Sequence, residues 1–204
     1  MVKVPNIVRK LFPSVFWKGS KDSKVVYLTF DDGPTPEVTV KVLALLKQYN
    51  AFATFFCLGN KVELYPTVFQ QVLEQGHSVG NHTHDHFLGL RTSNKNYFTD
   101  VEKANKVIQS YLFRPPYGKM KLSQYRFLNK KYKVVLWDVI PGDYKKSITV
   151  AKLISNVVDN VSNGSVVVLH DNEKCAAVML TALPVILNNL TSQGYQFKAI
   201  VNEK

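Results

Sequence analysis

The sequence predicts a single α/β domain in which mostly parallel strands form a distorted (β/α)7 barrel. Short apolar runs alternate with segments of helical periodicity along nearly the whole chain, which is typical of repeated strand–helix units. Seven such units are enough to close, or nearly close, a barrel through right-handed crossovers. The 204 residues, 46% of them apolar, can bury a substantial core, and no repeat or linker divides them.

The predicted elements follow one another in a regular order. We expect strands at 25–30, 52–57, 77–80, 112–114, 134–137, 166–169 and 197–201. We expect helices at 37–49, 66–74, 96–110, 122–131, 148–161 and 181–190, where apolar residues recur every three or four positions. Pro66 suits the first turn of its helix. The run 166–169 is apolar throughout, as expected for a strand buried on both faces.

Residues 1–22 are expected to form an arm that packs on the domain formed by residues 23–204. Apolar side chains between residues 8 and 16 approximate helical spacing, although Pro13 interrupts them, and docking of this arm on a membrane is the alternative. No apolar run reaches the 18 residues of a membrane span, and no secretory segment is visible. We therefore expect a cytoplasmic protein, with the cell envelope left open in case a leader was removed.

The net charge of +11 suits an anionic partner such as nucleic acid, a membrane surface or an acidic cell-wall polymer. The lysines are spread along the chain, so a soluble surface with surplus lysine explains the charge equally well. We therefore expect no nucleic-acid partner, and the oligomeric state stays open. Cys57 lies in an apolar strand and should behave as a small hydrophobic residue, while its pairing with Cys175 is left open.

Two adjacent carboxylates follow the first predicted strand, in the segment Thr29-Phe30-Asp31-Asp32-Gly33-Pro34. The Gly-Pro pair breaks the strand pattern and forces a turn. In α/β proteins, sites are built at this end of the strands. Two carboxylates this close repel each other unless a metal ion or a positive side chain compensates. In isolation, a turn with solvated carboxylates would explain the segment.

The third predicted strand leads into His82-Thr83-His84-Asp85-His86. His82 and His86 share a face if this segment begins a helix, which is a common way to present two imidazoles to one metal. One added aspartate gives two nitrogen ligands and one oxygen ligand, with a position left for water, as in catalytic sites. The alternative is a run of surface histidines. His84 would point away from the other two and is a weaker candidate ligand.

Three further strand ends also carry polar residues. Arg114 could neutralise one of the aspartates, and the backbone N–H of Tyr117 could face a reacting oxyanion. Asp143 follows a Pro-Gly turn and could orient a histidine. His170 comes directly after an apolar strand, where it suits a general acid. Each cluster alone has a structural explanation, but five consecutive strand ends favour one shared site.

From about residue 25 to 201, these segments resemble the polysaccharide deacetylase family, also known as the NodB-homology or carbohydrate esterase family 4 domain. Four segments correspond to its first, second, third and fifth motifs, namely Thr29-Phe30-Asp31-Asp32-Gly33-Pro34, His82-Thr83-His84-Asp85-His86, Arg114-Pro115-Pro116-Tyr117 and Val168-Leu169-His170. The resemblance implies a distorted barrel that removes N-acetyl groups from a sugar polymer or oligomer such as peptidoglycan or chitin.

The resemblance also implies a role for each site residue. Asp32, His82 and His86 would bind one divalent metal ion, in the first place zinc, although cobalt, manganese and nickel accept the same donors. The general base would be Asp31, paired with Arg114, and the general acid would be His170, tuned by Asp143. The backbone N–H of Tyr117 would help to hold the oxyanion, and the substrate pocket would be lined by Pro116, Tyr144 and Leu169.

One departure leaves the substrate open, because Tyr144 stands where the family usually has tryptophan. A second enzymatic interpretation therefore keeps the chemistry but changes the substrate to an O-acetyl ester, a formamide or a small amide. A non-enzymatic interpretation is a barrel that binds an anionic polymer and holds a structural metal. It predicts salt-sensitive binding that survives Asp31→Asn.

Overall fold

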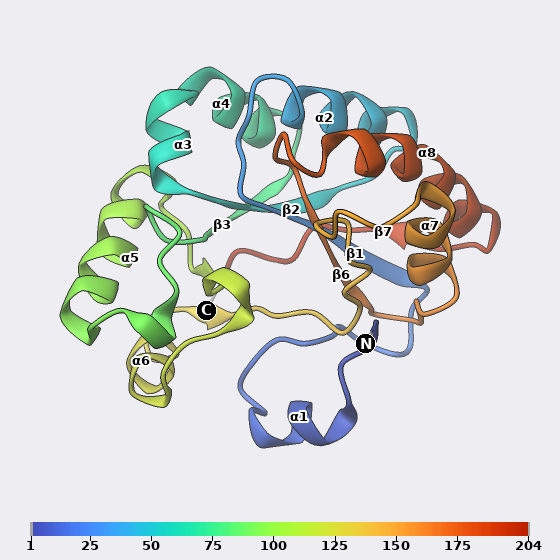
Figure 1. Ribbon diagram of the computed structural model, residues 1–204. Helices are drawn as coiled ribbons and strands as arrows, with labels where there is room; N and C mark the ends of the chain where they lie inside the picture. The colour runs from blue at the N-terminus through green and yellow to red at the C-terminus, as the bar shows by residue number, and fades with distance from the viewer. Residues whose placement is uncertain (1, 204) are drawn as a thin grey trace.

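A sheet of parallel strands forms the centre of the structure, a computed structural model that describes residues 2–203 (Figure 1). Its strands are β1 (Val25–Asp31), β2 (Ala53–Cys57), β3 (Ser78–Asn81), β4 (Leu112–Phe113), β5 (Lys133–Val134), β6 (Val166–His170) and β7 (Gln196–Phe197). Their order is β5-β4-β3-β2-β1-β6, with β7 paired to β1. A further parallel bridge joins Val139, beyond β5, to Val167 of β6, so the sheet curls into a distorted barrel. The predicted fold class is confirmed.

The register of the strands brings their carboxyl ends to one edge. Asp31, the last residue of β1, lies opposite Phe56 of β2 and His170 of β6. Asn81, the last residue of β3, lies opposite Phe113 of β4. Polar residues that follow these strands therefore meet at the same end of the barrel, where α/β proteins build their sites.

The helices are α1 (Asn6–Leu11), α2 (Thr39–Gln48), α3 (Gly59–Leu64), α4 (Pro66–Glu74), α5 (Asn94–Ile108), α6 (Leu122–Leu128), α7 (Val150–Val158) and α8 (Ala176–Ser192). Two short 3-10 turns, η1 (Gly89–Arg91) and η2 (Pro116–Gly118), lie in the loops. In Figure 1, α2, α4 and α8 form a layer over one side of the sheet, whereas α1 is set apart on the other side. The main buried cluster joins β1, β2 and β6 to α2, α7 and α8.

Successive residues of β6 face opposite sides of the sheet, as strand geometry requires. Val167 and Leu169 belong to the main cluster together with Leu183 of α8. Val166 belongs instead to a cluster with Phe56 on the other side. His170 is in phase with Val166, so it faces the inside of the barrel.

The structure differs from the predicted elements in two places near the site. The helix α3 was not predicted, because its six residues are too few to show helical periodicity. Its first turn is held by the loop after β3, where Gly59 N–H donates to the Thr83 carbonyl and Asn60 N–H donates to the His84 carbonyl. The helix α8 begins at Ala176, earlier than the predicted residue 181.

The N-terminal arm contacts the barrel through backbone bridges. Lys3 pairs with Val139 and Lys18 pairs with Ser165. Val4 N–H also donates to the Asp138 carbonyl over 3.0 Å. Within residues 2–203, no helix combines the length and apolarity that crossing a bilayer requires.

Candidate active site

A cavity of about 530 Å³ opens where the parallel strands end. Its walls consist of Asp31, Asp32, Leu58, Lys61, His82, His86, Tyr117, Trp137, Ile140, Tyr144, Val168, His170, Asn172, Glu173, Lys174 and Cys175. The aspartates at the end of β1, the histidines after β3 and the histidine that ends β6 therefore share one cavity. The structure brings these predicted site residues together.

Asp31 is nearly fully buried and is held by Arg114 behind it. Nη1 of Arg114 donates to Oδ1 of Asp31 over 2.6 Å and to Oγ1 of Thr29 over 2.8 Å. The guanidinium lies over the ring of Phe56, 4.0 Å from its centroid. Burial lowers the pKa of Arg114, while the charge of Asp31 opposes this shift. Because a buried ion pair depends on good geometry, this pair fixes the orientation of the Asp31 carboxylate.

Asp32, His82 and His86 place one donor atom each within 4.8 Å of one another. Oδ1 of Asp32 lies 3.6 Å from Nε2 of His82 and 3.2 Å from Nε2 of His86. This oxygen is buried and receives no well-formed hydrogen bond within the described chain. Burial by itself would raise the pKa of Asp32, but the close approach of His86 and the charges of the nearby histidines lower it overall. The group thus keeps an ionised carboxylate oxygen without a donor between two imidazoles.

The tautomer of His82 is set by a backbone contact. Its Nδ1 lies 2.8 Å from the carbonyl oxygen of Arg114, so Nδ1 carries the proton and Nε2 keeps its lone pair. His82 is only 2% exposed, and burial lowers its pKa although Asp31 and Asp32 act in the opposite direction. A buried, neutral imidazole of this kind is suited to metal binding.

His82 and His86 were expected to share a face if their segment began a helix, but the two residues lie in a loop. Thr83 and His86 adopt left-handed backbone conformations with φ of 67° and 57°. Side chains stabilise the loop in place of helical hydrogen bonds: Asn81 Oδ1 accepts from Thr83 N–H over 2.8 Å, and Asp100 Oδ2 accepts from His84 N–H over 2.8 Å. The two rings converge through this turn and not through helical spacing.

His84 points away from the cavity and is held between acidic side chains. Its Nδ1 lies 2.7 Å from Oδ1 of Asp85, and its Nε2 lies 3.2 Å from Oε2 of Glu63 on α3. The ring is 3% exposed. His84 therefore connects the histidine loop to α3.

His170 is paired with Asp143 on the opposite wall. Its Nδ1 lies 2.9 Å from Oδ1 of Asp143, and its backbone N–H donates to Oδ2 over 2.7 Å. Burial would lower the pKa of His170, but the bond to Asp143 and its charge raise the pKa to about 9. The imidazole is therefore charged at neutral pH.

Two residues directly after His170 were not predicted as site residues. Nδ2 of Asn172 donates to Oδ2 of Asp32 over 2.8 Å and so holds the second carboxylate. Asp171 accepts from Gly33 N–H over 3.0 Å and from the Thr39 hydroxyl over 2.6 Å, which fixes the turn after β1. Burial raises the pKa of Asp171 to about 7, despite the bond from Thr39. Their position directly after the β6 end was the signal that could have found them.

Of the three residues expected to line the substrate pocket, Tyr144 lies in the cavity wall, next to Tyr117 as a further wall residue, and the other two do not. Tyr144 and Tyr117 line the cavity, and their rings lie against His170 and His86 at centroid distances of 5.6 Å and 4.7 Å. Leu169 instead is fully buried in the main cluster, because it faces the helix layer; its neighbour Val168 lines the cavity. Pro116 is buried at the start of η2 and is not part of the wall.

The distorted parallel barrel gathers at its strand ends the aspartates and histidines that hydrolytic enzymes use as metal ligands, bases and acids. The chain belongs to the polysaccharide deacetylase family, whose sequence profile matches residues 18–135. It is therefore a hydrolase of amide bonds in acetylated polysaccharides, as the resemblance implied.

Named relatives support this assignment over most of the chain. A peptidoglycan-N-acetylglucosamine deacetylase of Bacillus cereus is 35% identical over 91% of each chain. The peptidoglycan-N-acetylmuramic acid deacetylase PdaC of Bacillus subtilis is 35% identical over 88% of this chain, which spans 38% of that longer protein. A chitooligosaccharide deacetylase of Azorhizobium caulinodans is 32% identical over 74% of this chain and 76% of its own.

Solved structures show the same architecture. The Bc1960 peptidoglycan N-acetylglucosamine deacetylase superposes with a TM-score of 0.90 at 27% identity, covering 98% of this chain and 100% of its own. The structure of PdaC from Bacillus subtilis superposes with a TM-score of 0.80 at 34% identity, covering 89% of this chain and 90% of the PdaC chain.

Proposed function

We propose that this chain removes N-acetyl groups from a peptidoglycan or chitin-like glycan with the help of one divalent metal ion. The observation that carries the proposal is the arrangement around Asp32: a carboxylate oxygen without a donor lies between two imidazoles. On either side are a carboxylate held by arginine and a histidine held by aspartate. The names of the relatives support the choice of an acetylated glycan.

The donor set fits a divalent metal ion. Two imidazole nitrogens and one carboxylate oxygen form a typical open catalytic set for zinc, and the same donors accept cobalt, manganese or nickel. When bound, the ion would supply Lewis acidity, which makes water a nucleophile near neutral pH. Asp32, His82 and His86 would hold it.

Asp31 is the proposed general base. Its Oδ1 is taken by Arg114, while its Oδ2 lies 3.9 Å from Nε2 of His82, next to the donor set. Oδ2 would take a proton from the water that attacks the amide carbonyl. The backbone N–H of Tyr117 would donate to the resulting oxyanion, and a single donor of this kind typically contributes about 100-fold or more in rate.

His170 is the proposed general acid. An amine leaves only when its nitrogen is protonated as the C–N bond breaks, so the acid has to enter the reaction charged. Asp143 meets this requirement by raising the pKa of His170 to about 9 and by occupying Nδ1, so the proton on Nε2 is the one delivered. General acid catalysis typically contributes about 10²- to 10⁴-fold.

The test is acetate release from chitin oligomers and peptidoglycan fragments. It compares wild type, chelator-treated protein to which metals are returned singly, and Asp31→Asn. Asp159→Asn is the matched control, because it makes the same change at an exposed position after α7. We expect one or more metals to restore activity, Asp31→Asn to abolish it and Asp159→Asn to leave it unchanged.

Two outcomes would redirect the proposal. Release from an O-acetyl ester but not from any N-acetylated sugar would keep the chemistry and change the substrate class. Tight metal binding without acetate release from any acyl compound would contradict the catalytic assignment. A polymeric peptidoglycan substrate would also require a cell-envelope location, which fractionation of the native host checks.

A further inference from the structure

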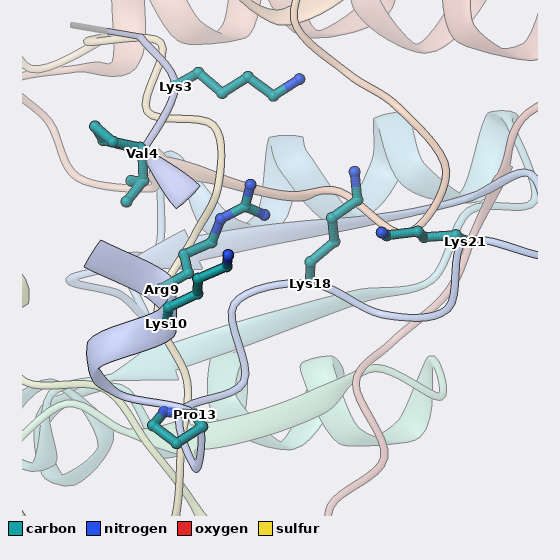
Figure 2. A pocket seen from close by; sticks show the side chains of 8 residues that line it. Lys3, Val4, Arg9, Lys10, Pro13, Lys18 and Lys21 are labelled. Atoms are coloured by element: carbon teal, nitrogen blue, oxygen red, sulfur yellow. The ribbon is translucent and has the colours of Figure 1, made fainter. Parts of the chain in front are cut away.

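The N-terminal arm borders a second cavity, which is open to solvent, has a volume of about 870 Å³ and shares no wall residue with the active-site cavity. It is lined by residues 3–21 alone: Lys3, Val4, Pro5, Arg9, Lys10, Pro13, Lys18 and Lys21. We call its five basic residues, Lys3, Arg9, Lys10, Lys18 and Lys21, the basic cup. Figure 2 shows the arm running from Lys3 past Pro13 and back to Lys21, with the charged ends of the basic cup turned toward the same space. Positive charge is therefore concentrated in one concave site.

The wall of the basic cup contains no acidic residue, and no Asp or Glu occurs in residues 1–21. Lys18 pairs with Asp138 at 3.7 Å. Asp138, however, is buried and already accepts from Val166 N–H over 2.8 Å and from the Ser165 hydroxyl over 3.0 Å. This carboxylate is thus engaged in holding the start of β6. The wall that the structure describes therefore carries five basic residues and no acidic residue.

The cations act on one another. Burial lowers the pKa of Lys18, Asp138 opposes this shift, and the charges of Lys3, Arg9 and Lys21 lower the pKa further. Mutual repulsion of this kind is relieved when an anion enters. The same charges raise the local concentration of anions at the cup.

The basic cup is also held in place before any ligand arrives. Its two ends are tied to the barrel by the bridges of Lys3 to Val139 and of Lys18 to Ser165. The Nζ of Lys18 donates to the Ser162 hydroxyl over 2.6 Å. A preformed site loses less conformational entropy on binding than a flexible tail with the same charges.

We propose that the basic cup is a binding site for phosphate-bearing anions. A carboxylate is satisfied by one guanidinium fork, whereas phosphate offers more acceptor oxygens and more charge for several cations that approach from different sides. The volume leaves room for more than one phosphate group. A soluble polyphosphate chain and the headgroup of an anionic lipid both present this chemistry. The site would account for part of the +11 net charge, which the active site does not use.

The first test is calorimetric titration of the whole chain with pyrophosphate and with tripolyphosphate at low salt. We expect binding that weakens with added salt. Arg9→Gln combined with Lys18→Gln should weaken it about a hundredfold, since each of the two lost charge-assisted contacts counts for about tenfold. Lys10→Gln with Lys21→Gln should also weaken it; both residues are exposed, so this pair changes the charge with little risk to folding.

The matched control is Lys47→Gln with Lys106→Gln, which removes two exposed lysines from α2 and α5 and lowers the net charge equally. We expect this variant to bind like wild type. Equal loss in the control and in the cup variants, or equally tight binding of polyglutamate, would overturn the proposal, because the overall charge would then explain the binding. Failure of wild type to bind either phosphate compound would also overturn it.

A second arm of the experiment distinguishes the two sources of phosphate. Binding to phosphatidylglycerol vesicles, but not to phosphatidylcholine vesicles, would identify a lipid headgroup. Ile7 and Leu11 are 67% and 69% exposed and four residues apart on α1, so Ile7→Gln with Leu11→Gln should weaken vesicle binding in that case. Binding to polyphosphate in solution without binding to vesicles would assign the site to a soluble polyanion. Retained acetate release in the cup variants would show that the two sites are separate.

Discussion

Two histidines in the active-site cavity have opposite electrostatic environments. Nδ1 of His82 faces the carbonyl oxygen of Arg114, and burial lowers the pKa of His82. Nδ1 of His170 faces the carboxylate of Asp143, which raises the pKa of His170 to about 9. Both rings are largely buried near the same aspartates, so the difference comes from the partner of Nδ1. A neutral partner leaves an electron-pair donor, whereas a charged partner creates an acid.

The largest loss of activity is expected when His82, the neutral histidine, is replaced. His82→Ala removes one of three metal donors and leaves Asp32 facing a void beside His86. We expect loss of stoichiometric metal, measured by elemental analysis after dialysis, and acetate release reduced by more than the roughly 10⁴-fold upper range of general acid catalysis. Normal metal content in His82→Ala would contradict its role as a ligand.

Replacing His170, the charged histidine, should separate metal binding from catalysis. We expect His170→Asn to keep its metal content, because His170 is not part of the donor group, and to lose about 10²- to 10⁴-fold in acetate release. Elemental analysis and the acetate assay on the same samples check this. Loss of metal together with activity would show that the two histidines do not differ as proposed.

The pH profile tests the cause of the difference directly. A general acid works only while protonated, so activity should fall as pH rises through the pKa of His170, at about 9. Asp143→Asn removes the charge that raises this pKa. The alkaline limb of kcat/KM should therefore move to lower pH, toward the ordinary histidine value of about 6.5 or below it. An unchanged limb would assign the alkaline limb to another group.

The parallel pairing of the strands and the gathering of titratable residues at the strand ends follow from patterns that sequence carries. Strand–helix alternation predicts parallel pairing, and parallel pairing places Asp31 and His170 at one edge. The histidine loop, with positive φ at Thr83 and His86, could not be predicted, since one of the acceptors that stabilise it is distant in sequence. Asn81 accepts from Thr83 N–H two residues on, but the acceptor for His84 N–H is Asp100 on α5.

Two other features show where sequence reasoning stops and where it could have gone further. The bond from Asn172 to Asp32 joins residues that follow two different strands, and no local pattern encodes it. The place of Leu169, by contrast, follows from strand alternation: if His170 faces the cavity, Leu169 faces the helices and Val168 takes the wall position.

The third histidine of the loop extends the comparison, because His84 has carboxylates on both ring nitrogens and lies outside the cavity. We expect His84→Asn to weaken metal binding about 10- to 100-fold, as is typical when groups that support metal ligands are lost. With metal in excess, kcat should stay close to that of wild type. Metal titrations followed by acetate release check both points, and a loss of kcat that excess metal cannot restore would assign His84 to the chemistry.

The smallest effect is expected at the wall beside the charged histidine. Tyr144 is 51% exposed, and its ring meets His170 edge-on at 5.6 Å. Tyr144→Trp enlarges this wall without changing the partner of Nδ1, so the pH profile should stay in place while KM changes by a factor of roughly 10 or less, the scale of one modest apolar contact. Measuring KM and the pH limb on chitin oligomers and peptidoglycan fragments separates the two effects. A shift of the alkaline pH limb together with KM would show that Tyr144, as well as Asp143, sets the charge of His170. The difference in pKa between His170 and His82 would then depend on more than the partner of Nδ1.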